Sequence, residues 1–231
     1  MTGREGEDGP TTREERIGLP GVVAVAAIPL VLAGNSLVLL LVPWLADLQY
    51  ALPGFPEDPL GLTPGERLDL AREGIRSIWP IGPGTELLVE AELPTERPAF
   101  TPDEVTHMDD VRTVVRGALV IWLVGVVAMI ASLAILRDRV GAIRTALRRG
   151  AVATVVLLAV VGLFALASFD TFFRSFHEAL FEPGSWQFPA DSTLLALYPT
   201  RFWTVATGLL VALALLQAVI LWLLPSPAEA E

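Results

Sequence analysis

Residues 101–136 read TPDEVTHMDDVRTVVRGALVIWLVGVVAMIASLAIL, and this stretch decides the fold. Thr101 and Glu104 form a capping-box pattern with proline at the first helical position, which is typical of a helix start. Apart from two glycines, no helix breaker follows before residue 136. Residues 117–136 are apolar and long enough to cross a bilayer. The pattern therefore predicts one long membrane helix that projects from the bilayer at its polar end.

The rest of the chain also has the composition of a membrane protein. Its 231 residues are 53% hydrophobic and have a mean hydropathy of +0.57. Three further apolar runs, at about 19–45, 150–169 and 203–224, are long enough to span. We therefore expect an all-α membrane protein with four transmembrane helices that pack together. The first run is over-long and holds three prolines, so we expect a tilted or kinked span that is not cleaved as a signal peptide.

The placement of arginine predicts the orientation. All sixteen basic residues are arginine, and five of them lie between 137 and 149 beside a single acid. By the positive-inside rule this loop is cytoplasmic. The expected organisation is a disordered cytoplasmic tail at 1–16, a transmembrane domain at 17–224 with extracytoplasmic segments at 46–112 and 170–202, and a cytoplasmic tail at 225–231.

The external segment 46–112 is long for a loop, so we expect it to hold helical structure of its own. Another capping box, from Thr63 to Glu66, precedes apolar residues at helical spacing and predicts an amphipathic helix on the outer interface. Residues 86–93 mix acidic and apolar side chains and are expected to form a short strand or a loop. The third span is expected to continue outward as one helix from residue 150 to about 181.

Charge and cysteine content exclude several classes of function. The formal net charge is −10, and residues 47 to 112 alone hold fourteen acids against five arginines, a balance of −9. Such a chain is no nucleic-acid binder, because phosphate binding requires a basic surface. The chain has no cysteine, which excludes disulfides, thiol nucleophiles and thiolate metal sites.

The chain has two histidines, and both are predicted to lie on the outer side of the membrane. His107 comes just before one apolar run, and His177 comes just after another. On its helix His107 shares a face with Glu104 and Asp110. A carboxylate beside an imidazole holds its tautomer and raises its basicity. His177 lies among phenylalanines, with Arg174 one turn before it.

Three chemistries suit such a pair. The first is general acid–base catalysis near neutral pH. The second is a metal site, but neither HExxH nor His-x-x-His spacing is present. The third is a covalent serine enzyme, for which the Gly-x-Ser-x-Gly elbow is missing. The structural alternative is an interfacial aromatic belt with a polar histidine between rings. We expect neither a metal nor another cofactor.

Four motifs resemble those of the Lit-type lipoprotein intramolecular transacylases, a family of bacterial four-span integral membrane proteins. They are E-x-x-H-M-x-D-V at 104–111, F-x-x-F-H-x-x-x-F at 173–181, Trp186 with Asp191, and L-Y-P-x-x-F-W at 197–203. The resemblance extends from residue 20 to residue 224. The chain departs from the family in its long acidic segment, 46–100, and in using arginine alone as its basic residue.

The resemblance implies an acyltransferase of the bacterial cell membrane with its active site at the extracytoplasmic face. Such an enzyme moves the sn-2 acyl chain of a diacylglyceryl-cysteine lipoprotein to the α-amine of that cysteine and produces a lyso-form lipoprotein. Its partners are diacylated bacterial lipoproteins and membrane lipid. The substrate brings its own nucleophile, an amine with a pKa of about 7.7–8.0 that must lose a proton to attack. A histidine suits that task.

On this basis we expect His177 to act as the base, His107 to act as the donor or acid, and Asp110 to orient His107. The other motif residues expected to contact substrate are Glu104, Phe173, Arg174, Trp186, Asp191, Tyr198 and Trp203.

Two other classes stay open. One is a non-enzymatic lipid-binding or assembly factor built on the same scaffold. The other is a proton-coupled transporter, against which we set the lack of an acid at mid-membrane depth. Asn35 is interpreted as the only strongly polar side chain there.

Overall fold

The computed structural model describes residues 17–224, so the two predicted tails, 1–16 and 225–231, lie outside the described residues. The described chain is almost entirely helical, which confirms the predicted all-α class, and its one isolated β-bridge joins Glu92 and Pro98. The helices of this part are α1 (Gly18–Leu40), α2 (Trp44–Ala51), α3 (Pro64–Ser77), α4 (Glu86–Val89), α5 (Pro102–Ile135), α6 (Val140–Ala167), α7 (Phe169–Leu180), α8 (Thr193–Leu197) and α9 (Thr200–Leu223).

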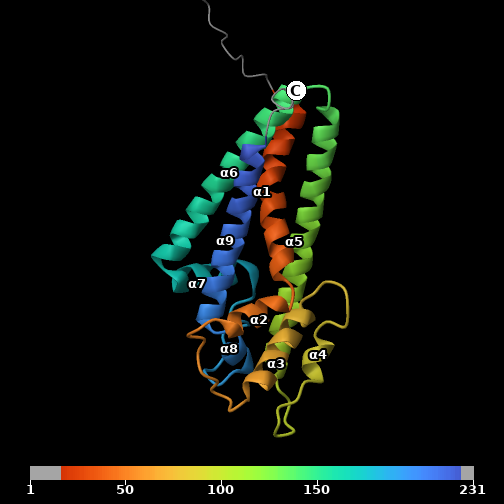
Figure 1. Ribbon diagram of the computed structural model, residues 1–231. Coiled ribbons are helices and arrows are strands. Elements are labelled where there is room, and N and C mark those ends of the chain that lie inside the picture. The colour runs from red at the N-terminus through yellow and green to blue at the C-terminus, as the bar shows by residue number, and fades with distance from the viewer. Residues whose placement is uncertain (1–16, 225–231) are drawn as a thin grey trace, which may run out of the picture.

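Four of these helices, α1, α5, α6 and α9, are long and apolar enough to cross a membrane, as predicted. Figure 1 shows them as the elongated part of the molecule, with α2, α3, α4 and α8 gathered at one end. Helix α1 packs against the other three spans, and α6 also packs against α9. Large apolar side chains on α5, α6 and α9 are exposed, as lipid-facing surfaces require.

A hydrogen-bonded cluster joins three of the spans. The Asn35 amide donates to Gln217 Oε1 over 2.9 Å, and Trp122 Nε1 donates to Asn35 Oδ1 over 3.0 Å. The Gln217 amide also donates to Ser36 Oγ over 3.0 Å. Gly34 makes room for the Trp122 ring, because a Cβ at this position would overlap it. The view of Asn35 as the only strongly polar group at this depth was wrong, since Gln217 is its partner.

The long helix predicted from 101 to 136 is confirmed as α5, and both predicted capping boxes are formed. In each, the threonine side chain, Thr63 or Thr101, accepts from the backbone N–H three residues on, while the glutamate there accepts from the threonine backbone N–H. Residues 86–93 differ from the prediction of a strand or loop, because they begin with the short helix α4.

Two predicted spans are shorter than expected. The first apolar run is one span followed by the separate helix α2, with Pro43 at the N-cap of α2 and a bend before it. The helix expected from 150 to 181 starts earlier and breaks at Ser168, where φ is −161° and ψ is 102°. Ser168 Oγ accepts from Thr171 N and so caps α7, which turns away from the direction of α6.

At the extramembrane end, α3 packs against α2, α4, α5 and α8, so its apolar face covers protein. Arg67 Nη1 donates to Pro56 O over 2.7 Å, and its other Nη donates to Ala196 O. The Tyr198 hydroxyl donates to Ala71 O over 2.6 Å. Gly74 permits this approach, because a Cβ there would overlap the tyrosine hydroxyl. These bonds fix α3 against α8 and the loop before α3.

Candidate active site

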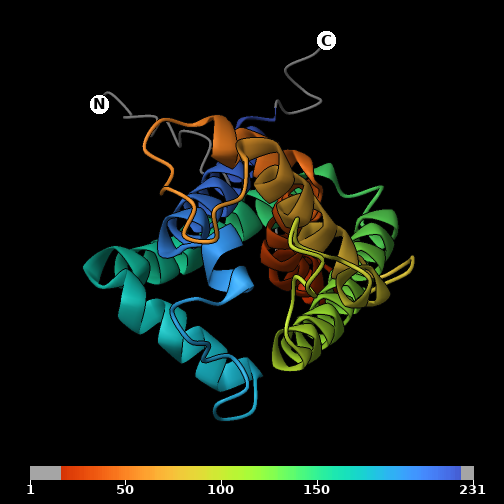
Figure 2. The same cartoon turned by 90° about the horizontal axis from the view of Figure 1, so that it is seen from below.

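The two histidines lie side by side, His107 on α5 and His177 on α7. Their ring centroids are 6.2 Å apart and their planes are inclined by 23°. The break at Ser168 makes this possible, because it lets α7 turn back toward α5 (Figure 2). His107 is near the start of α5, whereas the arginine-rich turn between α5 and α6 follows the end of α5, at the far end of the bundle in Figure 1. Two residues from distant parts of the chain are thus brought together as the motif pattern predicts.

Five aromatic side chains surround the pair, and we call them the aromatic box. Their ring centroids lie at 4.0 Å (Phe173), 5.5 Å (Phe176), 5.4 Å (Phe181) and 5.0 Å (Trp186) from His177, and at 5.0 Å (Phe181) and 5.5 Å (Phe188) from His107. Phe181 therefore contacts both imidazoles. The box leaves each histidine only 8% exposed.

His177 has a defined tautomer. Its Nδ1 lies 2.8 Å from the carbonyl oxygen of Phe173, and a carbonyl can only accept, so Nδ1 carries the hydrogen. Nε2 then keeps its lone pair. Burial lowers the pKa of His177, while the bond to Phe173 partly opposes that effect. At neutral pH His177 is a neutral imidazole with a free acceptor nitrogen, as a general base requires.

His107 lies on the part of α5 that precedes the apolar stretch. Burial, and then the neighbouring His177, lower its pKa to about 4. It is therefore neutral at neutral pH and keeps one N–H to donate. Its Nδ1 is buried and has no hydrogen-bond partner among residues 17–224. No hydrogen bond joins the side chains of His107 and Asp110 within residues 17–224, so the orientation of His107 by Asp110 stays a prediction.

Glu104 holds the scaffold and does not face the site. Its side chain is 1% exposed, and both carboxylate oxygens are engaged. Oε2 accepts from Thr101 N over 2.7 Å, and Oε1 accepts from Ser192 Oγ over 2.6 Å and Leu194 N over 2.9 Å. The carboxylate thus links the starts of α5 and α8. The expectation that it contacts substrate does not agree with this geometry.

The remaining residues predicted to contact substrate fall into three groups. Phe173 and Trp186 belong to the aromatic box, and Trp203 lies at its edge, 6.1 Å from the Phe173 ring. Tyr198 is buried, and burial raises its pKa well above the ordinary value. Its hydroxyl is bonded to α3, so its contact with substrate stays a prediction. Arg174 and Asp191 are exposed.

Three members of the box, Phe176, Phe181 and Phe188, were absent from the predicted site residues. Phe181 ends the second motif and lies four residues after His177, so its spacing on the helix was a usable signal. Phe188 lies in the loop before α8 and reaches His107 only through the tertiary fold. Its sequence context carries no signal for that contact.

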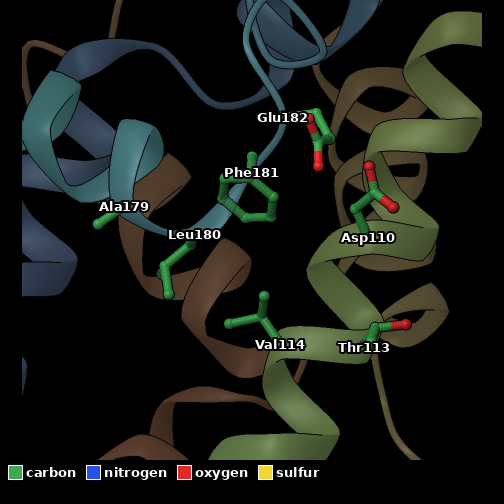
Figure 3. A pocket seen from close by; sticks show the side chains of 7 residues that line it. All are labelled: Asp110, Thr113, Val114, Ala179, Leu180, Phe181 and Glu182. Carbon is green, nitrogen blue, oxygen red and sulfur yellow. The ribbon is translucent and has the colours of Figure 1, made fainter.

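Two cavities flank the histidine pair. Cavity 1, of about 380 Å³, is lined by Asp110, Thr113, Val114, Ala179, Leu180, Phe181 and Glu182 (Figure 3). Cavity 2, of about 510 Å³, is lined by Thr101, Asp103, Thr106, Pro183, Gly184, Ser185, Gln187, Phe188 and Pro189. The carboxylates of Asp110 and Glu182 face the same gap in Figure 3, and neither has a hydrogen bond or ion pair within 17–224.

The serines near the site have other partners. Ser192 Oγ donates to Glu104, Ser185 Oγ donates to the Glu182 carbonyl, and Ser168 caps α7. No serine–histidine hydrogen bond occurs in the described residues. Within the same range, no group of three or more histidines and carboxylates has the arrangement of a metal site.

Comparison with known proteins gives three findings. The model of the family described as lipoprotein intramolecular transacylase Lit matches residues 86–203, more than half of the chain and a range that includes both histidines. An uncharacterized protein of Aquifex aeolicus (strain VF5) is 28% identical over 209 residues, which cover 87% of this chain and 91% of that protein.

Solved structures of the lipoprotein intramolecular transacylase Lit from Bacillus cereus are also similar. One superposes with a TM-score of 0.74 at 17% identity, covering 89% of this chain and 92% of the other. A variant of that protein with one histidine replaced by alanine gives a TM-score of 0.70, with 90% of it covered. At this identity the likeness shows that the two proteins share a fold.

Proposed function

The chain belongs to the lipoprotein intramolecular transacylase family, and we propose that it carries out an intramolecular acyl transfer at the histidine pair. The sn-2 acyl chain of a diacylglyceryl-cysteine lipoprotein would move to the α-amine of that cysteine. One observation carries the proposal. Two buried neutral imidazoles lie 6.2 Å apart, and His177 has a free Nε2 because its Nδ1 is bonded to a backbone carbonyl.

The proposed reaction begins at the α-amine. Once the α-ammonium has released one proton to solvent, the neutral amine nitrogen attacks the carbonyl carbon of the sn-2 ester, and His177 Nε2 takes a second proton from that nitrogen as the C–N bond forms. A neutral His107 donates its N–H to the oxyanion that develops. When the tetrahedral intermediate collapses, the ester C–O bond breaks and the proton on His177 passes to the leaving glycerol oxygen. The products are an amide and a free hydroxyl, so no water is consumed.

The low pKa of His107 supports the donor role. An imidazole that stays neutral until about pH 4 offers an N–H without bringing a full charge into an apolar box. The amine and the ester belong to one molecule, so holding them together contributes much of the acceleration. The aromatic box excludes water, which would otherwise hydrolyse the ester.

We also propose an orientation. The arginine-rich turn, 137–149, would lie in the cytoplasm, and the histidine pair would lie at the extracytoplasmic face of a bacterial cell membrane. The substrate partners would then be diacylated lipoproteins in the outer leaflet. Reporter fusions after Phe100 and Gln187 should read external, and a fusion after Ile143 should read cytoplasmic. Cytoplasmic labelling of either histidine segment contradicts this orientation.

The decisive experiment follows a synthetic diacylglyceryl lipopeptide by mass spectrometry. Purified His107→Ala and His177→Ala proteins should each form the lyso product about 10²–10⁴-fold more slowly, as expected for general acid–base groups. The double variant should be little worse than the poorer single variant, because the two act as one unit. Ser175→Ala, on the exposed side of α7, is the control and should keep wild-type activity. Normal turnover by the double variant, or an acyl group trapped on a serine, contradicts the mechanism.

A further inference from the structure

The two cavities lie at different depths along α5. Thr106 of cavity 2 and Asp110 of cavity 1 are on either side of His107 in the helix. From Asp103 to Thr113 the helix rises by about 15 Å. The apolar stretch of α5 begins at residue 117, so cavity 1 is the one nearer the bilayer. Cavity 2 lies farther from the apolar stretch.

The segment opposite α5, from Phe181 to Phe188, also places the histidine pair between the two cavities. Phe181 lines cavity 1 and contacts both imidazoles, at 5.0 and 5.4 Å between ring centroids. Phe188 lines cavity 2 and contacts His107 at 5.5 Å. Each of these phenylalanines thus lines one cavity and contacts the histidine pair, so the proposed reacting groups lie between the two cavities.

Cavity 1 fits the lipid end of a substrate. Val114 and Leu180 contribute apolar side chains to its lining. Asp110 and Glu182 have no cationic partner among the described residues and face the gap in Figure 3. An α-ammonium and a glyceryl ester, followed by two acyl chains, match this combination of charge and apolar surface.

Cavity 2 has a different lining. It combines hydroxyl and amide groups, from Thr106, Ser185 and Gln187, with the ring of Phe188. Backbone amides of an extended peptide need such hydrogen-bonding groups, and its side chains need such apolar contacts. A diacylglyceryl-cysteine has only one part that leaves toward solvent, and that part is the polypeptide.

We propose that cavity 2 binds the first residues of the lipoprotein polypeptide, directly after the lipidated cysteine. The inference rests on the proposed function, because it places the cysteine at the histidines. From His107 to Asp103 the helix rises by about 6 Å, roughly the length of two extended residues. The second and third residues of the lipoprotein then lie in cavity 2, while the acyl chains leave through cavity 1.

Photo-crosslinking tests this placement in the wild-type chain. A diacylglyceryl lipopeptide with p-benzoylphenylalanine at its third residue is irradiated with the purified protein, and the adduct is mapped by mass spectrometry. We expect crosslinks within 101–106 or 183–189. The same group at the twelfth residue should not label these segments. Crosslinks from the third residue that fall only outside both segments overturn the proposal.

Kinetics give a second test. We compare kcat/KM for a ten-residue lipopeptide with kcat/KM for diacylglyceryl-cysteine amide. Their ratio measures how much the peptide part of the substrate raises catalytic efficiency. We expect a ratio of about 10 in the wild type, equivalent to about 1.4 kcal/mol. Thr106→Trp fills cavity 2 from α5 and should bring the ratio close to one, mainly by raising KM for the lipopeptide. Thr95→Trp, exposed and lining neither cavity, should keep the wild-type ratio.

The outcomes separate the two proposals. Failure of the wild type to convert either substrate contradicts the proposed function. Conversion of both substrates with equal efficiency contradicts the peptide site alone. An unchanged ratio in Thr106→Trp also contradicts the peptide site. If Thr106→Trp loses all activity, the crosslinking of the wild-type chain decides.

Discussion

Two parts of the molecule at the same end of the bundle are held together differently. In the layer formed by α2, α3, α8 and the start of α5, hydrogen bonds join buried polar side chains. By contrast, α7 and the segment after it contact α5 through aromatic rings. Glu104 of α5 and Arg67 of α3 both bond to α8, and Tyr198, directly after α8, bonds to α3. No hydrogen bond within the described residues joins 169–191 to α5. We call these two parts the bonded layer and the aromatic half.

The difference shows how the two histidines are held. His107 is on a helix whose start is tied to the bonded layer, so its position is fixed by the scaffold. His177 is on an element held by ring contacts, which are weak in direction and tolerate movement. A substrate with two acyl chains and a polypeptide must pass between α5 and α7. The aromatic half is the part that can move without unfolding the bonded layer.

The largest expected effect on stability comes from the bonded layer. Glu104→Ala removes the acceptor of four donors, two of them buried, and should lower the free energy of unfolding by about 3 kcal/mol or more, because each hydrogen bond to a charged group contributes about 1.5–3 kcal/mol. His177→Ala should change it by less than about 1 kcal/mol, within the usual range for one side chain. Melting in detergent, followed by tryptophan fluorescence, measures both. Equal losses in the two variants would show that the halves unfold together.

Local sequence patterns predicted the structural features that depend on residues close together in the sequence. Both capping boxes and the apolar runs act within one helix, so α5 and the four spans followed from them. The placement of His107 and His177 at the same end of the bundle followed from counting spans, because each span reverses the side of the membrane, whereas their direct contact did not.

Other features depended on contacts distant in sequence. Glu104 shares a helical face with His107, yet its carboxylate turns to the start of α8, which only the tertiary fold places there. The break at Ser168 contains neither glycine nor proline. It arises where the serine caps an amphipathic helix that turns its aromatic residues toward α5. Phe188 reaches the site by the same kind of distant contact.

Acidification should lower the stability of the folded protein through His107. The expected loss is smaller than that caused by Glu104→Ala. The pKa of His107 is about 4 in the folded protein and about 6.5 when exposed. Below pH 6.5 the unfolded chain binds this proton first, so the stability contributed by neutral His107 is present above pH 6.5 and is lost as the pH falls toward 4. His107→Phe removes that titration. Its melting temperature should therefore fall less between pH 7 and pH 5 than that of the wild type, and an equal fall would place the cause in other groups.

The smallest expected effect compares the same kind of cap in the two halves. Thr101 and Ser168 each accept the backbone N–H three residues on, and losing such a cap costs about 1 kcal/mol. In the bonded layer the loss should spread, because α5 is tied to α8, so Thr101→Ala should lower the melting temperature of the whole protein. Ser168→Ala should leave it unchanged and instead speed hydrogen exchange of the first α7 amides about fivefold, since α7 opens alone. A fall in melting temperature equal to that of Thr101→Ala would mean that α7 is as firmly joined to the scaffold as α5 is. The ring contacts around the histidines would then be structural, and substrate would have to enter without movement of α7.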